Sequence, residues 1–71
     1  MALLTPIQSD ELPIAGVLID VSEGGFRVRH SYGGLRKNQI VGFIHRFREG
    51  VARVIWHKAA DLDFETGFKY L

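Results

Sequence analysis

The chain of 71 residues contains no cysteine, which excludes a disulfide, a thiolate zinc site and a cysteine nucleophile. It has only two prolines, Pro6 and Pro13, so we expect residues 1–13 to form an extended arm and residues 14–71 to form one small domain. No apolar run approaches the ~18 residues of a membrane span. The first residues also lack the basic and apolar regions of a signal peptide. We therefore expect a cytoplasmic protein without membrane insertion.

Basic residues are missing from the first part of the chain. Residues 1–26 carry four acidic side chains and no Lys or Arg, whereas residues 27–58 carry eight basic side chains against Glu49 alone. Such a basic middle can attract an anionic ligand, or it can pair with the acidic ends inside the fold. The charge distribution alone leaves both interpretations open.

After Pro13 the sequence alternates apolar and polar residues with the period of a β-strand. Phe26 and Val28 are expected on one face of such a strand, and Arg27 and Arg29 on the other. Five alternating runs at roughly 8–12-residue spacing, separated by turn signals, predict an all-β fold. We expect a small antiparallel β-barrel of five to six short strands with no C-terminal helix, because closure removes the exposed edges of such an apolar sheet.

The same alternation predicts where the core and the connections lie. Phe47 is expected on an inner face, followed by a hairpin turn at residues 48–50 and a polar loop at residues 58–63. The predicted core consists of Phe26, Val28, Val41, Phe43, Val54, Trp56, Phe64 and Phe68.

The stretch from Asp20 to Gly25 gathers turn-forming residues between two β-patterned runs. Asp20 and Ser22 can bond to backbone N–H groups of a turn, and Gly24 and Gly25 allow positive φ. A tight β-corner can use such residues for structure alone. Because several polar groups converge there, the corner is also the candidate binding site.

The motifs resemble those of the PilZ domain family in order and spacing. The corner has the family's pattern Asp-x-Ser-x-x-Gly, and it leads into the alternating strand FRVRH at residues 26–30. Asn38 stands where the family often has glycine, and asparagine also tolerates a left-handed conformation. The sequences VIW at residues 54–56 and TGF at residues 66–68 complete the resemblance, which covers residues 14–71.

This resemblance implies a non-enzymatic bacterial signalling module that binds cyclic di-GMP, a second messenger with two phosphates and two guanines. It implies ligand contacts from the corner. The family's second signature, Arg-x-x-x-Arg before the corner, is absent, and the corresponding residues 5–11 (TPIQSDE) are acidic. Guanidinium groups match phosphate oxygens and stack on bases, so arginines past the corner, or arginines of a partner, would have to substitute. The implied ligand-binding residues are Asp20, Ser22, Gly24, Gly25, Arg27 and Arg29.

Two other functions stay open. A degenerate PilZ adaptor would bind only a protein partner, and a small basic barrel with a stacking side chain such as Tyr32 would bind single-stranded nucleic acid. The three histidines lie on different predicted strands, so no metal or cofactor is expected, and no nucleophile elbow indicates catalysis. Self-association as a homodimer is expected near residues 64–71, where no helix covers the apolar surface.

Overall fold

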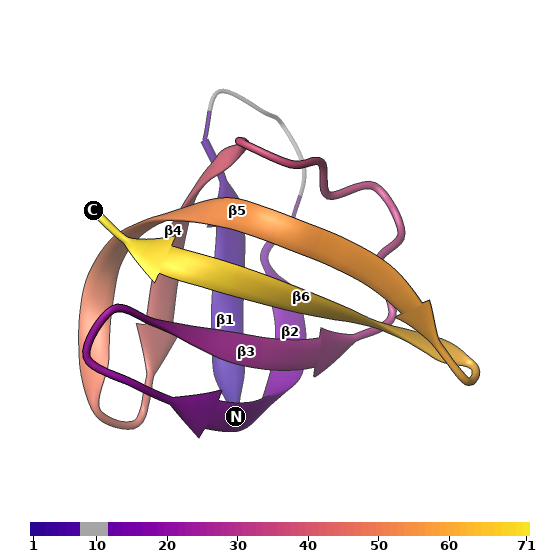
Figure 1. Ribbon diagram of the computed structural model, residues 1–71, viewed down its shortest axis with the longest axis horizontal. Coiled ribbons are helices and arrows are strands. Elements are labelled where there is room, and N and C mark those ends of the chain that lie inside the picture. The colour runs from indigo at the N-terminus through magenta and orange to yellow at the C-terminus, as the bar shows by residue number, and fades with distance from the viewer. Residues whose placement is uncertain (8–11) are drawn as a thin grey trace.

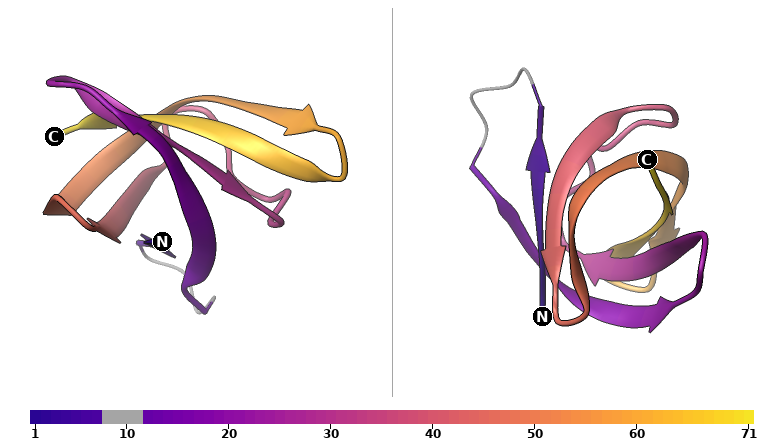
Figure 2. Two further views of the ribbon diagram at one scale, coloured as in Figure 1. Left: turned by 90° about the horizontal axis from the view of Figure 1, so that it is seen from below. Right: turned by 90° about the vertical axis from the view of Figure 1, so that its left-hand side faces the viewer.

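The computed structural model describes residues 1–7 and 12–71 of the chain. Six antiparallel strands close into a barrel in the order β1-β2-β3-β6-β5-β4, which confirms the predicted all-β barrel (Figure 1). Seen from the side, the strands curve around a common centre (Figure 2). Within the described residues, no helix has the length and apolar character to cross a membrane. The strands are β1 (Ala2–Pro6), β2 (Ile14–Val21), β3 (Gly25–His30), β4 (Ile40–His45), β5 (Arg48–Ala60) and β6 (Asp63–Tyr70).

Alternate residues of each strand point into the barrel. On β3, Phe26 and Val28 are buried, while Arg27 and Arg29 are only partly covered on the outer face, as the alternation predicts. The rings of Phe26 and Phe68 stack with centroids 4.8 Å apart. The buried apolar core consists of Ala2, Leu4, Ile14, Phe26, Val28, Leu35, Val41, Phe43, Ala52, Val54 and Phe68.

The N-terminal segment belongs to the barrel. Strand β1 pairs with β2 on one side and with β4 on the other, so it joins the two ends of the sheet. Ala2 and Leu4 are 1% and 0% exposed. Burial of these side chains and closure of both sheet edges stabilise this position of the strand. The expectation of an arm over residues 1–13 is therefore wrong for β1, and its part at residues 8–11 lies outside the described residues.

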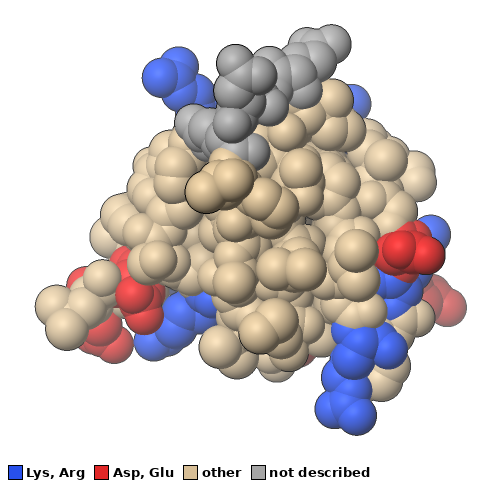
Figure 3. Space-filling view, turned by 180° about the vertical axis from the view of Figure 1, so that it is seen from behind, with Lys and Arg blue, Asp and Glu red and all other residues tan. Residues whose placement is uncertain are grey.

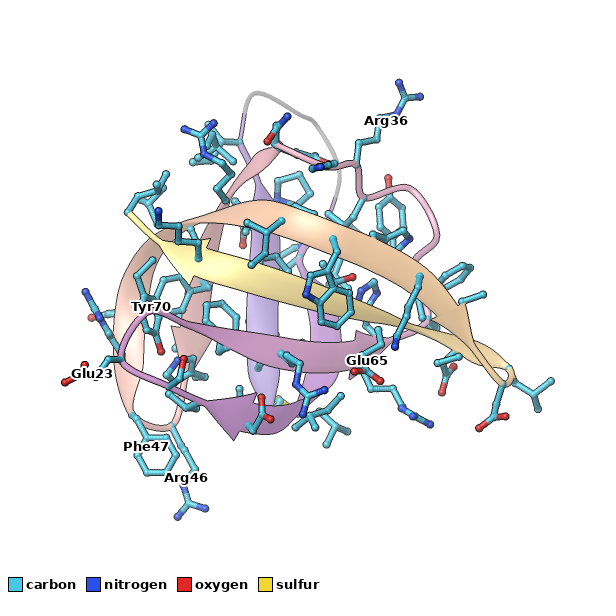
Figure 4. The ribbon with its side chains drawn as sticks, in the orientation of Figure 1. Glu23, Arg36, Arg46, Phe47, Glu65 and Tyr70 are labelled. Carbon is cyan, nitrogen blue, oxygen red and sulfur yellow. The ribbon has the colours of Figure 1, made fainter. Side chains whose placement is uncertain are left out.

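The hairpin between β4 and β5 turns earlier than expected. Its connection is the pair Arg46 and Phe47, and residues 48–50 already belong to β5. Phe47 was expected on an inner face, but it is 68% exposed at the tip of this hairpin (Figure 4). The backbone N–H of Phe47 donates to Nδ1 of His45 at 3.2 Å. The ring nitrogen of His45 therefore accepts the turn hydrogen bond that an Asp, Asn or Ser side chain usually accepts. Because histidine is not a common turn residue, the sequence did not indicate a turn at this position.

Strand β5 contains a β-bulge that shifts its side-chain alternation. Val54 pairs with Phe68, whereas the next pair joins Trp56 to Gly67, so Ile55 is the extra residue. Trp56 therefore lies on the outer face, over Gly67, and is only partly buried. The expectation that Trp56 belongs to the core is wrong because of this bulge.

The far end of the β5–β6 hairpin also differs from the expectation. Strand β5 continues to residue 60 and β6 begins at residue 63, so most of the predicted loop at residues 58–63 is strand. Phe64 was expected in the core, but it is only partly buried and stacks on His57, with ring centroids 5.2 Å apart. The ladder between the two strands extends to Ala60 opposite Asp63, which keeps this end ordered as a hairpin.

One outer face of the barrel is largely uncharged. Its exposed apolar side chains come from β1, β2 and β4 and include Leu3, Val17, Ile19 and Ile44. Figure 3 shows this side, where Lys, Arg, Asp and Glu lie toward the margins and leave the centre uncharged. The open apolar surface was expected near residues 64–71, but β6 lies on the opposite side of the barrel (Figure 1). The exposed apolar face is therefore placed differently from the expectation.

Candidate ligand-binding groove

The predicted corner is a short loop that joins β2 to β3 and is also attached to β6. The backbone N–H of Ser22 donates to the carbonyl of Gly25 at 2.8 Å, and the Ser22 hydroxyl lies 3.4 Å from the same oxygen. The backbone N–H of Tyr70 donates to the carbonyl of Gly24 at 3.0 Å. These bonds fix the loop against the barrel, so its polar groups have defined positions.

Gly25 is required by a close backbone approach. Glycine allows a positive φ at the corner, but none of the described glycines has one. A Cβ atom on Gly25 would lie 1.9 Å from the carbonyl oxygen of Phe68, which belongs to the backbone of β6. A Cβ atom on Gly24 would meet nothing within 4 Å. The two adjacent glycines therefore have different structural roles.

Arg27 joins the corner to the outer face of the barrel through two carboxylates. Its Nε donates to the two carboxylate oxygens of Asp20 at 2.9 and 3.0 Å, and its Nη2 binds the same carboxylate. Its Nη1 donates to Oε1 of Glu65 at 3.2 Å. The hydrogen bonds from Arg27 lower the pKa of Asp20, and those to Asp20 raise the pKa of Arg27 above its usual value. Asp20 is therefore an ionised acceptor at neutral pH, with about half of its side chain exposed.

Arg29 belongs to the same charge network but lies farther along β3. Its Nη2 lies 3.8 Å from Oε2 of Glu65, and its Nη1 lies 3.9 Å from Oδ2 of Asp61. The Glu65 side chain is only 11% exposed and reaches from β6 toward both arginines (Figure 4). Arg27 and Arg29 are therefore already engaged by carboxylates of this chain.

An open groove of about 510 Å³ runs along the corner. This volume is within the range of about 300–1,000 Å³ that small-molecule sites occupy. Five of the six predicted ligand-binding residues line the groove, and Arg29 does not. The complete lining consists of Asp20, Val21, Ser22, Gly24, Gly25, Phe26, Arg27, Ile55, Trp56, Gly67, Phe68 and Lys69.

Trp56 and Lys69 complete the groove from the β5–β6 side, and the sequence did not indicate them as site residues. The indole packs so closely on Gly67 that a Cβ atom there would lie 2.3 Å from the indole Nε1. Nζ of Lys58 lies 5.3 Å from the centroid of the Trp56 ring, at cation–π distance. Three successive large apolar residues at positions 54–56 were the available signal, because a run without alternation is compatible with a bulge.

The three histidines serve the barrel structure. Nε2 of His30 and Nδ1 of His57 each lie 2.7 Å from Oγ1 of Thr66, while Nε2 of His45 lies 3.0 Å from the hydroxyl of Tyr70. Burial lowers the pKa of both His30 and His45. Among residues 1–7 and 12–71, no three His, Asp or Glu side chains are grouped so that they could hold a metal ion.

The groove thus combines an ionised carboxylate, a hydroxyl, a guanidinium, an ammonium and an indole. Such a set can recognise a planar heterocycle through its hydrogen-bonding edge and its face, together with an attached anion. A scan against protein-family models, a search of curated proteins and a search of solved structures found no match for this chain.

Proposed function

We propose that this chain is a non-enzymatic bacterial signalling module of the PilZ type, which binds cyclic di-GMP weakly and regulates a partner through protein contacts. One observation carries the proposal: the corner with the pattern Asp-x-Ser-x-x-Gly lines a groove whose other wall is an indole and a lysine. The corner residues are adjacent in sequence, whereas the indole and the lysine come from β5 and β6.

A guanine base matches the groups on both walls. Its 2-amino group is a donor for the carboxylate of Asp20, which Arg27 keeps ionised. Arg27 has five N–H donors, and its three bonded nitrogens leave two further N–H groups for the acceptor edge of guanine. The indole of Trp56 offers a face for stacking, which typically contributes about 1–3 kcal/mol per base.

We expect weak binding because carboxylates of the chain already hold the two arginines of β3. Arg27 and Arg29 would each have to leave a carboxylate in order to clamp a phosphate. The acidic segment at residues 5–11 offers no replacement. Each missing charge-assisted bond costs about 1.5–3 kcal/mol of binding free energy, so we expect affinity between the micromolar and the millimolar range.

The uncharged outer face of β1, β2 and β4 supports the second part of the proposal, which is regulation through protein contacts. Large exposed apolar patches are typical of protein interaction sites. The same face favours a second candidate function, an adaptor of PilZ type that binds a protein partner and no nucleotide.

Tryptophan fluorescence tests the nucleotide site directly, because Trp56 is the only tryptophan of the chain and lines the groove. Titration with cyclic di-GMP should change the indole emission in a saturable manner. Asp20→Asn should weaken the response by about tenfold or more, because it replaces a charged acceptor. Glu49→Gln likewise neutralises one carboxylate, on an exposed residue of β5 that does not line the groove, and should respond as the wild type does.

The outcomes separate the two candidate functions. An emission change that is saturable and sensitive to Asp20→Asn supports the nucleotide receptor. No change up to millimolar ligand, in a protein that remains folded, would refute nucleotide binding and favour the adaptor.

A further inference from the structure

Two cations face each other on the outer side of the β5–β6 pair. Arg53 of β5 is in register with Lys69 of β6, and both side chains are exposed. Both point outward, because their neighbours Val54 and Phe68 are buried in the core. Residues directly opposite on one face have Cβ atoms about 4.5–5.5 Å apart, and like charges at that separation repel each other.

No acidic side chain relieves this repulsion from the flanking strands. The register partner of Arg53 on β4 is Ile40, and the partner of Lys69 on β3 is Gly25. Every ion pair between described residues is formed by arginines of β3. Glu23 of the nearby corner loop points away from the barrel (Figure 4). Within residues 1–7 and 12–71, neither Arg53 nor Lys69 forms an ion pair with an acidic side chain, so the pair is a local concentration of positive charge.

The pair also adjoins the groove. Lys69 lines the groove and lies two residues along β6 from Gly67, the residue under the Trp56 ring. Two residues of a strand span roughly 7 Å, which is the order of the separation between the base and the phosphate of a nucleotide. Gly25, on the other side of Lys69, has no side chain to obstruct the approach of a ligand.

We propose that Arg53 and Lys69 form a phosphate clamp for a nucleotide whose base stacks on Trp56. A phosphodiester has two equivalent anionic oxygens, one for the Arg53 guanidinium and one for the Lys69 ammonium. This inference rests on the proposed function for the identity of the nucleotide, cyclic di-GMP. The clamp takes the role of the absent Arg-x-x-x-Arg pair from the other side of the groove.

The test compares wild type, Arg53→Gln, Lys69→Gln, the double variant and Arg36→Gln. Arg36 lies on the loop before β4 and points away from the barrel, so its substitution is a matched charge control (Figure 4). Cyclic di-GMP affinity is measured by Trp56 fluorescence, and we expect each clamp substitution to raise Kd by about tenfold. Arg36→Gln should leave Kd unchanged.

A second measurement separates the clamp from the identity of the nucleotide. Melting temperature is recorded with inorganic pyrophosphate and with sodium chloride of equal ionic strength. Pyrophosphate should raise the melting temperature of the wild type above the sodium chloride value, and it should not do so for the double variant. Without added anion the double variant should melt at or above the wild-type temperature, because its substitutions remove a repulsion.

Unchanged Kd in both clamp variants would overturn the clamp and leave the proposed function intact. If the wild type shows no fluorescence response to cyclic di-GMP but pyrophosphate raises its melting temperature, and does not raise that of the double variant, binding of cyclic di-GMP is refuted and the anion site is supported. Failure of both responses would overturn the two proposals together. Tighter binding of a single-stranded oligonucleotide than of cyclic di-GMP would overturn the assignment to a compact nucleotide.

Discussion

Substitution of the two adjacent corner glycines by alanine should have very different effects on stability. In Gly25→Ala the new methyl group would lie 1.9 Å from the carbonyl oxygen of Phe68, so β3 and β6 must move apart. Forcing a methyl group into a packed site costs about 1–3 kcal/mol, and here the obstacle is backbone. A single-core domain of this size has only ~3–5 kcal/mol of stability, so this cost is a large fraction of the total.

The melting temperature converts this cost into a measurable shift. At about 4–8 °C per kcal/mol for a domain of this size, Gly25→Ala should melt roughly 5–20 °C below the wild type. Gly24→Ala is the matched control, because its methyl group meets nothing within 4 Å and its φ is not positive. It should leave stability unchanged or raise it by up to about 1 kcal/mol, since alanine restricts the unfolded chain. The melting temperatures are measured by circular dichroism. Equal values for the two variants would show that the backbone of β6 does not approach Gly25 closely.

Three further predictions test other parts of the fold. Leu4→Ala should lower the free energy of unfolding in urea by about 2–5 kcal/mol, because Leu4 is fully buried in β1. Leu3→Ala, on the outer face of the same strand, should lower it far less. Similar small decreases for both variants would show that residues 2–6 form an arm outside the barrel. Burial lowers the pKa of His30 and His45, so the unfolded chain takes up protons first. The free energy of unfolding should be at its full value above about pH 6.5 and should decrease below that pH, by at most about 1.4 kcal/mol per pH unit for each histidine. A free energy of unfolding that does not change between about pH 7.5 and 5 would contradict this. Gly67→Ala should displace the indole and shift its fluorescence emission to longer wavelength, and an unchanged spectrum would show that the indole does not pack on β6.

The sequence predicted those features that depend on local pattern. Strand β3 alternates strictly, so the inward Phe26 and the outward Arg27 could be assigned without knowledge of the neighbouring strands. Asn38, which stands where the PilZ family often has glycine, has a φ of 75°, a left-handed conformation that asparagine tolerates. The corner residues gather at one groove because they are adjacent in the chain.

Features that depend on distant contacts were not predictable in the same way. Strand β1 is defined by its pairing with β4, which lies far along the chain, and prolines indicate only that the segment is not a helix. Trp56 faces outward because a bulge adds one residue against β6; the break in alternation at residues 54–56 is compatible with a bulge but does not show which residue is the extra one. Lys69 reaches the groove because β6 pairs with β3, so only the closed barrel places it beside the corner.

The corner and Trp56 should act together as one nucleotide-binding groove. The most direct measurement is a proton–nitrogen NMR titration of the full chain with cyclic di-GMP. We expect chemical shift changes at residues 20–27, at Lys69 and at the indole Nε1–H of Trp56, with the remainder of the spectrum nearly unchanged. An unchanged spectrum at millimolar ligand, or changes confined to the outer face of β1, β2 and β4, would contradict it.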